Sequence, residues 1–279
     1  MFLVRIIFLL LFSSSVFAWN SAGHRVIAQI AYDQLTPQTK KAVDALTEVM
    51  FHSPYPDARF LRAATWPDQI KSKTKQYNAW HFIDLPIVKD GETAPPLDPK
   101  NVVWAIAHAE KVVGDTAINP HERARYLSFL IHFVGDIHQP LHCATLYDKQ
   151  FPSPRGDEGG NLYDIHSPIA DHLHPFWDAG LGLFYSAHDQ YRFRYNQVEI
   201  IAQQWMQAYP PASFGEMLNV TSPMMWANES HAIAVNVVYD VPVNATPSPA
   251  YVQAGQVIVQ KQAVLAGDRL AAVLNKLIK

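Results

Sequence analysis

Two histidine–aspartate pairs in the chain share a spacing of four residues. The segment His132-Phe-Val-Gly-Asp136-Ile-His-Gln-Pro-Leu-His142 holds the first pair, and His174-Pro-Phe-Trp-Asp178 holds the second. On a helix, residues four apart lie on the same face, one turn from each other. An imidazole and a carboxylate so placed can bind one cation, and zinc prefers such nitrogen and oxygen ligands. A single pair is more commonly a hydrogen bond on a helix surface, so the repetition carries the metal hypothesis.

More potential ligands lie where helices can bring them together. Pro140 should break or kink the helix after Asp136, which lets His142 point at a neighbouring position. A lone histidine beside apolar residues is more often a core residue than a ligand. Eight groups that can converge make that alternative a poor explanation of the whole set. The eight are His24, Asp68, His81, His132, Asp136, His142, His174 and Asp178.

The elements that must position these groups are helical. Apolar residues recur every three or four positions over Ser21–Leu35, Pro37–Met50, Asp57–Ile70, Pro99–Ile118, Pro120–His142, Gln190–Tyr209 and Pro249–Ile278. Val237–Val243 is either a short strand or the end of a helix from Ser230. Loops are predicted over Lys89–Lys100 and over the Pro- and Gly-rich Lys149–Asp171. Alternating β-branched runs are scarce, so we predict an all-α fold.

The first eighteen residues have the pattern of a secretory signal peptide. Arg5 gives a positive start, Ile6–Phe12 is apolar, and Ser13–Ala18 ends in small residues. The alternative is a membrane anchor, but the apolar run is short for a bilayer. Cleavage after Ala18 would leave one mature domain, residues 19–279, beginning at Trp19. We therefore expect a secreted or periplasmic monomer without a membrane anchor after processing.

Composition restricts how this protein can bind a polyanion. The chain has 22 basic and 25 acidic residues, and removal of Arg5 with the leader leaves 21 against 25, a charge of −4. A protein that neutralises phosphates with lysine and arginine is normally basic. Bound cations would have to supply the positive charge here. The single cysteine, Cys143, excludes an internal disulfide and is expected to be buried.

These residues also carry a family resemblance. The motifs are Trp19 with Gly23-His24, Trp66-Pro-Asp68, Trp80-His-Phe-Ile-Asp84, the segment 132–142, Gly159-Gly160-Asn161, Leu173-His174 through Trp177-Asp178, and Trp226-Ala-Asn-Glu229-Ser230. In this order they resemble the zinc-dependent type I nucleases of fungi and plants, which prefer single strands, and their bacterial relatives. The absence of disulfides points to a bacterial-type member. The region Asp148–Asp157, which should shape a base pocket, shows no match.

The resemblance implies three zinc ions. One would be bound by Asp68, His81, His132 and Asp136, a second by His142, His174 and Asp178, and the third by His24, by Asp136 as a bridge, and by the backbone amine and carbonyl of Trp19. An α-amine is free to bind a metal only after signal cleavage. The precursor is therefore expected to be inactive.

The implied reaction is hydrolysis of single-stranded DNA and RNA, with 3′-nucleotides as further substrates. Water held between the first and third zinc would attack phosphorus, and the second would stabilise the leaving 3′-oxygen, which leaves a 5′-phosphate. Lys71, one turn after Asp68, is expected to meet a phosphate oxygen where the best-known relatives have arginine. Its alternative is a solvated lysine in a cluster with Lys73 and Lys75.

Three further residues receive a role beside the metals. Phe82 is expected to stack on a nucleobase, although a core position fits it as well. Asp84 is expected to orient a metal ligand, and Asn161 to contact substrate.

Two other functions fit part of the pattern. An exported zinc phospholipase C shares a trinuclear centre and an amino-terminal Trp ligand, but the close spacing of Trp19 and His24 and the His-x3-Asp ending favour the nuclease. A periplasmic protein that only binds zinc is the non-enzymatic alternative.

Overall fold

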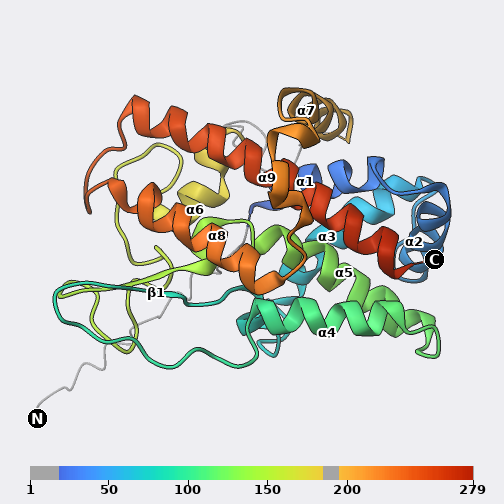
Figure 1. Cartoon of the computed structure of the whole chain (residues 1–279), viewed down its shortest axis with the longest axis horizontal. Helices are drawn as coiled ribbons and strands as arrows, with labels where there is room; N and C mark the ends of the chain where they lie inside the picture. Colours follow the sequence, from blue (N-terminus) through green and yellow to red (C-terminus); the bar gives the residue numbers. More distant parts are fainter. Residues whose placement is uncertain (1–18, 185–194, 279) are drawn as a thin grey trace, which may run out of the picture.

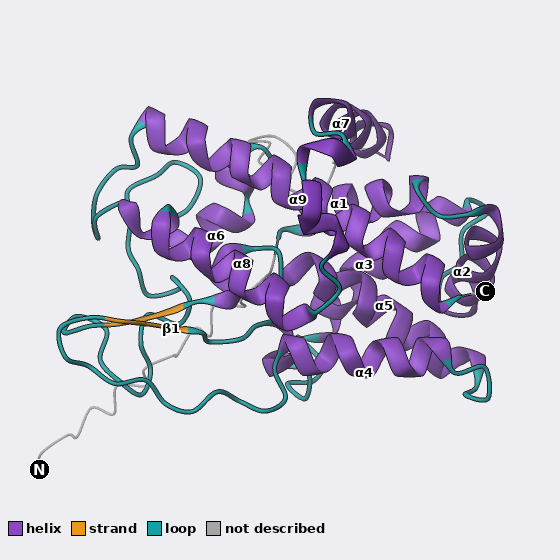
Figure 2. Ribbon diagram, viewed as in Figure 1, coloured by secondary structure: helices purple, strands orange, loops and turns teal. Residues whose placement is uncertain are grey.

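The fold of the chain was obtained as a computed structural model, which describes residues 19–184 and 195–278. Helices dominate this part of the chain (Figures 1 and 2). The longer ones are α1 (Ser21–Asp33), α2 (Pro37–Met50), α3 (Pro56–Ile70), α4 (Val102–Gly114), α5 (Pro120–Asp136), α7 (Tyr195–Ala208), α8 (Pro223–Asn236) and α9 (Pro249–Leu277). The short α6 spans Leu173–Asp178. The expected all-α fold is confirmed.

Helix α5 lies at the centre of the bundle. It packs against α2, α3, α4 and α9, while α1 packs against α3 and α9. Its second half is buried all round, with Leu127, Phe129 and Phe133 fully enclosed. A helix that is apolar on every side belongs in the core. The polar His132 and Asp136 are therefore carried into the interior on this same helix.

Helix ends differ from the predicted ranges where caps and prolines act. The helix predicted over Pro99–Ile118 begins only at Val102, because the Asn101 side chain accepts hydrogen bonds from the first-turn amides. The helix predicted over Pro120–His142 ends at Asp136, and a separate 3₁₀ turn, η2 (Pro140–Cys143), begins at the proline. His142 is thereby placed off the axis of α5.

Two other predictions are corrected or fall partly outside the described residues. Val237–Val243 is neither a strand nor the end of a helix that starts at Ser230. Helix α8 begins earlier, at Pro223, and ends at Asn236, after which a 3₁₀ turn, η6, spans Val238–Asp240. The helix predicted over Gln190–Tyr209 is described from Tyr195 to Ala208. The predicted leader, 1–18, lies outside the described residues.

A small parallel sheet joins two segments that leave the centre of the fold. Strand β1 (Pro86–Val88) pairs with β2 (Thr145–Tyr147) (Figure 2). The register places Ile87 opposite Leu146. Strand β1 follows the 3₁₀ turn η1 (Asn78–His81), and β2 follows η2. The pairing therefore fixes His81 and His142 relative to each other. Strands of three residues carry too little alternation to be predicted from sequence.

Within the part of the chain that is described, no helix combines the length and the apolar character needed to cross a membrane.

Candidate metal centre

Four side chains from three elements meet beside the end of α5. His132 and Asp136 project from one face of that helix, with His132 Nε2 3.3 Å from Asp136 Oδ2. His81, at the end of η1, places Nδ1 2.9 Å from the same oxygen and 3.1 Å from His132 Nε2. Asp68, on α3, brings Oδ1 to 3.6 Å from His132 Nε2. All four are buried, and we call Asp68, His81, His132 and Asp136 the first cluster.

His24 extends the first cluster on the side of α1. Its Nε2 lies 3.3 Å from Asp136 Oδ1, and its ring stacks on that of His132. Gly135 makes this approach possible, since a Cβ there would come within 3.0 Å of His24 Nδ1. The buried indole of Trp19 donates from Nε1 to the Gly135 carbonyl at 3.0 Å. Trp19 and His24 are thus both held against the last turn of α5.

A second cluster consists of His142, His174 and Asp178. The Nε2 atoms of His142 and His174 are 3.1 Å apart, and His174 Nε2 is 3.4 Å from Asp178 Oδ2. Gln139, which the sequence did not single out, donates from Nε2 to Asp178 Oδ1 at 2.6 Å. That bond leaves Oδ2 of the carboxylate turned towards His174. A glutamine three residues after a ligand has no distinctive pattern, so only the structure reveals it.

The histidine hydrogen bonds show which ring nitrogens are available. Nδ1 of His132, His142 and His174 donates to the carbonyls of Ala64, His81 and Gly159 at 2.7, 2.7 and 2.6 Å. A carbonyl can only accept, so in each neutral ring Nε2 carries a lone pair. The facing Nε2 atoms of His142 and His174 therefore present two lone pairs to each other. A cation between them would resolve that repulsion.

Electrostatics in both clusters favour the same conclusion. Burial lowers the pKa of His24 to about 4 and also lowers the pKa values of His81, His132 and His142, so these imidazoles are neutral near pH 7. Burial also raises the pKa of the Asp136 carboxyl, and Asp68 adds to the increase. Both ring nitrogens of His24, His81 Nε2 and Asp136 Oδ1 are buried without hydrogen bonds. Neutral imidazoles beside clustered carboxylates form a donor set that suits a divalent cation.

A pocket of about 220 Å³ opens next to the second cluster. Its wall includes His174 together with three residues that the sequence singled out, Phe82, Asp84 and Asn161. Asp84 accepts a hydrogen bond from Thr145 Oγ1 at 2.6 Å. Arg155 and Glu158, which form an ion pair, also line the pocket and were not predicted. Arg155 lies in the region Asp148–Asp157, for which the sequence offered no match, and Glu158 directly follows that region.

Lys71 lies beside the first cluster at the end of α3. Its Nζ is 2.8 Å from Asp68 Oδ1, and its side chain is 13 % exposed. The lysine is therefore partly buried at the centre, which differs from the solvated position that was its alternative.

The motif Trp226–Ser230 packs near the turn that connects the two clusters. Ser230 Oγ donates to the Ile137 carbonyl at 2.6 Å, and Glu229 binds both terminal nitrogens of Arg269. Arg269 Nη1 in turn donates to His138 Nε2 at 2.9 Å. These contacts brace the turn between the two clusters.

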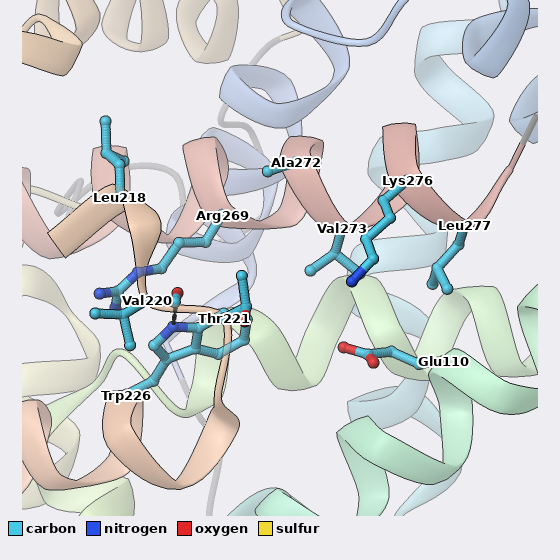
Figure 3. Close-up of a pocket in the computed structure, with 10 residues that line it drawn as sticks. All are labelled: Glu110, Leu218, Val220, Thr221, Trp226, Arg269, Ala272, Val273, Lys276 and Leu277. Atoms are coloured by element: carbon cyan, nitrogen blue, oxygen red, sulfur yellow. Dashed lines mark hydrogen bonds between the residues drawn. The ribbon is translucent and has the colours of Figure 1, made fainter. Parts of the chain in front are cut away.

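Another cavity, of about 240 Å³, lies between α4, α8 and α9 (Figure 3). Arg269 and Trp226 line one end of it, and Glu110 faces Lys276 at the other. No residue of the first or second cluster lines it.

The fold and these clusters define a helical protein with buried His/Asp groups that could hold metal ions beside an open pocket. The chain belongs to the S1/P1 Nuclease family, whose sequence model matches residues 19–279. It is 26 % identical to Endonuclease 3 of Arabidopsis thaliana, over 99 % of this chain and 95 % of the relative. Nuclease P1 of Penicillium citrinum is 27 % identical over 57 % of both chains, and Nuclease S1 of Aspergillus oryzae 22 % over 93 % and 91 %.

The family match confirms the resemblance seen in the motifs. It also confirms the expected enzyme class, because nucleases hydrolyse phosphoester bonds of nucleic acids. These relatives are named nucleases or endonucleases, so they do not support the phospholipase C alternative.

Proposed function

We infer that the protein is an exported zinc-dependent endonuclease that hydrolyses single-stranded DNA and RNA to 5′-phosphorylated products and also acts as a 3′-nucleotidase. The observation that carries this is the pair of facing Nε2 atoms of His142 and His174, 3.1 Å apart with both Nδ1 atoms already donating to carbonyls. The family match supports nucleic acid as the substrate.

Three zinc ions would be held by the two clusters together with His24 and Trp19. The first cluster would hold one zinc, the second cluster another, and His24, Asp136 and the amine and carbonyl of Trp19 a third. When bound, zinc supplies Lewis acidity towards a phosphate and lowers the pKa of water. The backbone carbonyls that accept from His132, His142 and His174 keep each Nε2 aimed inward.

The chain's other residues would bind and orient the substrate. Lys71 carries the cation beside Asp68 that can meet a phosphate oxygen. Phe82, in the wall of the pocket, can stack on a base, and stacking serves single strands without sequence preference. Asp84 and Asn161 can hydrogen-bond the base or sugar from the same wall. Because a paired base is not free to enter a pocket, this arrangement favours single strands.

Export is the second part of the proposal. The leader pattern of residues 1–18 supports export, and the family match that begins at residue 19 is compatible with a mature domain that starts there. We propose that the protein works outside the cytoplasm, secreted or in a periplasm, as a monomer.

The direct test uses the mature protein that begins at Trp19. Elemental analysis should give three zinc ions per chain, and hydrolysis should be faster on single-stranded DNA or RNA than on duplex DNA. A 3′-nucleotide should release phosphate, and phosphatidylcholine should not be cleaved. Hydrolysis of phosphatidylcholine alone would support a phospholipase C instead. Zinc binding without any hydrolysis would support a storage or transport protein.

Zinc affinity is expected to fall as the pH is lowered. Burial raises the pKa of the Asp136 and Asp178 carboxyls, so protons compete with metal for these oxygens, whereas the neutral imidazoles need no deprotonation. Each displaced proton changes the affinity by about tenfold per pH unit. Zinc titrations of the metal-free protein between about pH 8 and about pH 5 measure this slope. An affinity that does not change with pH would contradict carboxylate ligation.

Lys71→Met is expected to lower kcat/KM on single strands by about tenfold or more, because it would remove one charge-assisted contact to phosphate from the ammonium beside Asp68. The zinc content should stay unchanged. Lys71→Arg should restore most of the rate, since its guanidinium offers the same charge. Lys73→Met, an exposed neighbour, is the matched control. Equal losses in both variants would mean that a general basic surface, rather than Lys71, attracts the substrate.

A further inference from the structure

A buried carboxylate outside both clusters organises the loop that borders the substrate pocket. Asp157 is 0 % exposed. Its Oδ1 accepts from the Leu146 amide of β2 at 2.8 Å, and its Oδ2 accepts from the Tyr239 hydroxyl of η6 at 2.7 Å. The amides of Gly159 and Gly160 also donate to this carboxylate. One side chain thus holds β2, η6 and the glycine loop, which we define as residues 156–162.

The glycine loop leads directly to the second cluster. The carbonyl of Gly159 accepts from His174 Nδ1 at 2.6 Å, and the carbonyl of Gly160 accepts from the His174 amide at 3.1 Å. Gly159 has a φ of +62°, and a Cβ there would lie 2.7 Å from the Leu141 carbonyl. The loop is therefore pressed against η2, which carries His142. Its position determines where the imidazole of His174 points.

We propose that Asp157, together with Tyr239, is a positioning residue that holds the Gly159 carbonyl against His174 Nδ1 and so keeps Nε2 aimed at the zinc of the second cluster. The proposal rests on the proposed function, which places zinc there. Asp157 would touch neither the metal nor the substrate. It would act through one amide–carbonyl unit of the glycine loop.

The same loop also shapes the pocket. Glu158, Gly159 and Asn161 line it, and the Asn161 side chain donates to the Glu158 carbonyl at 2.8 Å. A shift of the loop would move these residues with His174. Asp157 is therefore expected to affect both metal binding and substrate binding.

The hydrogen-bond donors around Asp157 stabilise the ionised form of its carboxylate. Burial raises its pKa to about 6, against hydrogen bonds from Tyr239 and from three backbone amides that lower it. The titratable groups around it are Tyr239, Tyr163 and Tyr147, whose pKa values are all raised, so each stays neutral near pH 7. Near neutral pH the carboxylate is ionised, and the Tyr239 hydroxyl and the nearby backbone amides donate to it. Charge-assisted hydrogen bonds of this kind are the stronger ones.

The test compares Asp157→Asn and Tyr239→Phe with the wild type and with a control in the same stretch of chain, Asp148→Asn. Asparagine at 157 keeps the volume but turns an NH₂ group towards donors. In Asp148→Asn, the side-chain Oδ1 that accepts hydrogen bonds from the Gln150 and Phe151 amides is retained. Zinc is titrated into each metal-free protein, and KM is measured on a short single-stranded oligonucleotide.

Asp157→Asn is expected to bind one of the three zinc ions about 10- to 100-fold more weakly, with a higher KM, and Tyr239→Phe should show a smaller loss of the same kind. Asp148→Asn should match the wild type. Wild-type affinity for all three ions in Asp157→Asn would overturn the proposal. If Asp157→Asn does not melt cooperatively, the comparison of Tyr239→Phe with the wild type decides.

A second measurement does not depend on zinc. In the metal-free protein the Nδ1–H proton of His174, held by Gly159, should give a protected downfield NMR resonance. We expect it in the wild type and in Asp148→Asn, and we expect it to be lost in Asp157→Asn. Its persistence there would refute the positioning role. A wild type that binds no zinc but shows this resonance only with Asp157 intact would refute the proposed function and leave the positioning role standing.

Discussion

Asp136→Asn is expected to abolish hydrolysis of single-stranded nucleic acid, with a loss in kcat/KM of about 10³-fold or more. The carboxylate lies within 3.3 Å of nitrogens on His24, His81 and His132, so one substitution disturbs the donors of two proposed zinc ions at once. The amide is isosteric but uncharged, which separates loss of metal binding from loss of packing. Rates on a labelled oligonucleotide and zinc content by elemental analysis measure the effect.

Asp90→Asn is the matched control. Asp90 is exposed in a loop with a φ of +57°, a conformation that asparagine also adopts, so this variant should keep three zinc ions and the full rate. Nuclease activity near the wild-type level in Asp136→Asn would show that the metal centre takes no part in the hydrolysis.

Retaining one residue before Trp19 is expected to remove one of the three proposed zinc ions and lower the rate by about 10²-fold or more. The indole of Trp19 is fixed by its bond to the Gly135 carbonyl, beside His24 and Asp136, so the start of the mature chain cannot move far from the first cluster. A peptide bond in place of the α-amine has no lone pair for a metal. Zinc content and kcat are compared between chains that begin at Ala18 and at Trp19.

The control for this prediction is the same preparation after an aminopeptidase has removed Ala18, which should regain zinc and activity together. An extended chain that binds three zinc ions and cleaves as fast as the mature form would show that the amino terminus is not a ligand. The precursor would then be active before export.

The placement of candidate metal ligands could be predicted from the sequence where a local rule of helix geometry applies. The spacing of His132 and Asp136 follows from helix geometry, and so does that of His174 and Asp178. Pro140 correctly indicated a break before His142, although the helix ends earlier, at Asp136. The family motifs then supplied Asp68 and His81, which no spacing connects to α5.

Residues whose roles depend on distant contacts could not be found in this way. Gln139 matters because α6 brings Asp178 to its amide, and Arg155 because it lines the same pocket as Phe82. Asp157 is joined to Tyr239, 82 positions away. Turns and loops place such groups through long-range hydrogen bonds, and sequence patterns of a few residues do not record them.

One backbone hydrogen bond bears on the order in which this protein can be assembled. The amide of Asn20 donates to the carbonyl of Asp178 at 2.9 Å, which joins the start of α1 to the end of α6. If the chain is translocated amino terminus first, Asn20 can form this hydrogen bond only after more than half of the sequence, up to Asp178, has emerged. Closing so long a loop has an entropic cost, which metal binding can offset. Zinc capture and the final folding step would then coincide on the far side of the membrane, so the nuclease would acquire its activity only after it had left the nucleic acids of its own cell.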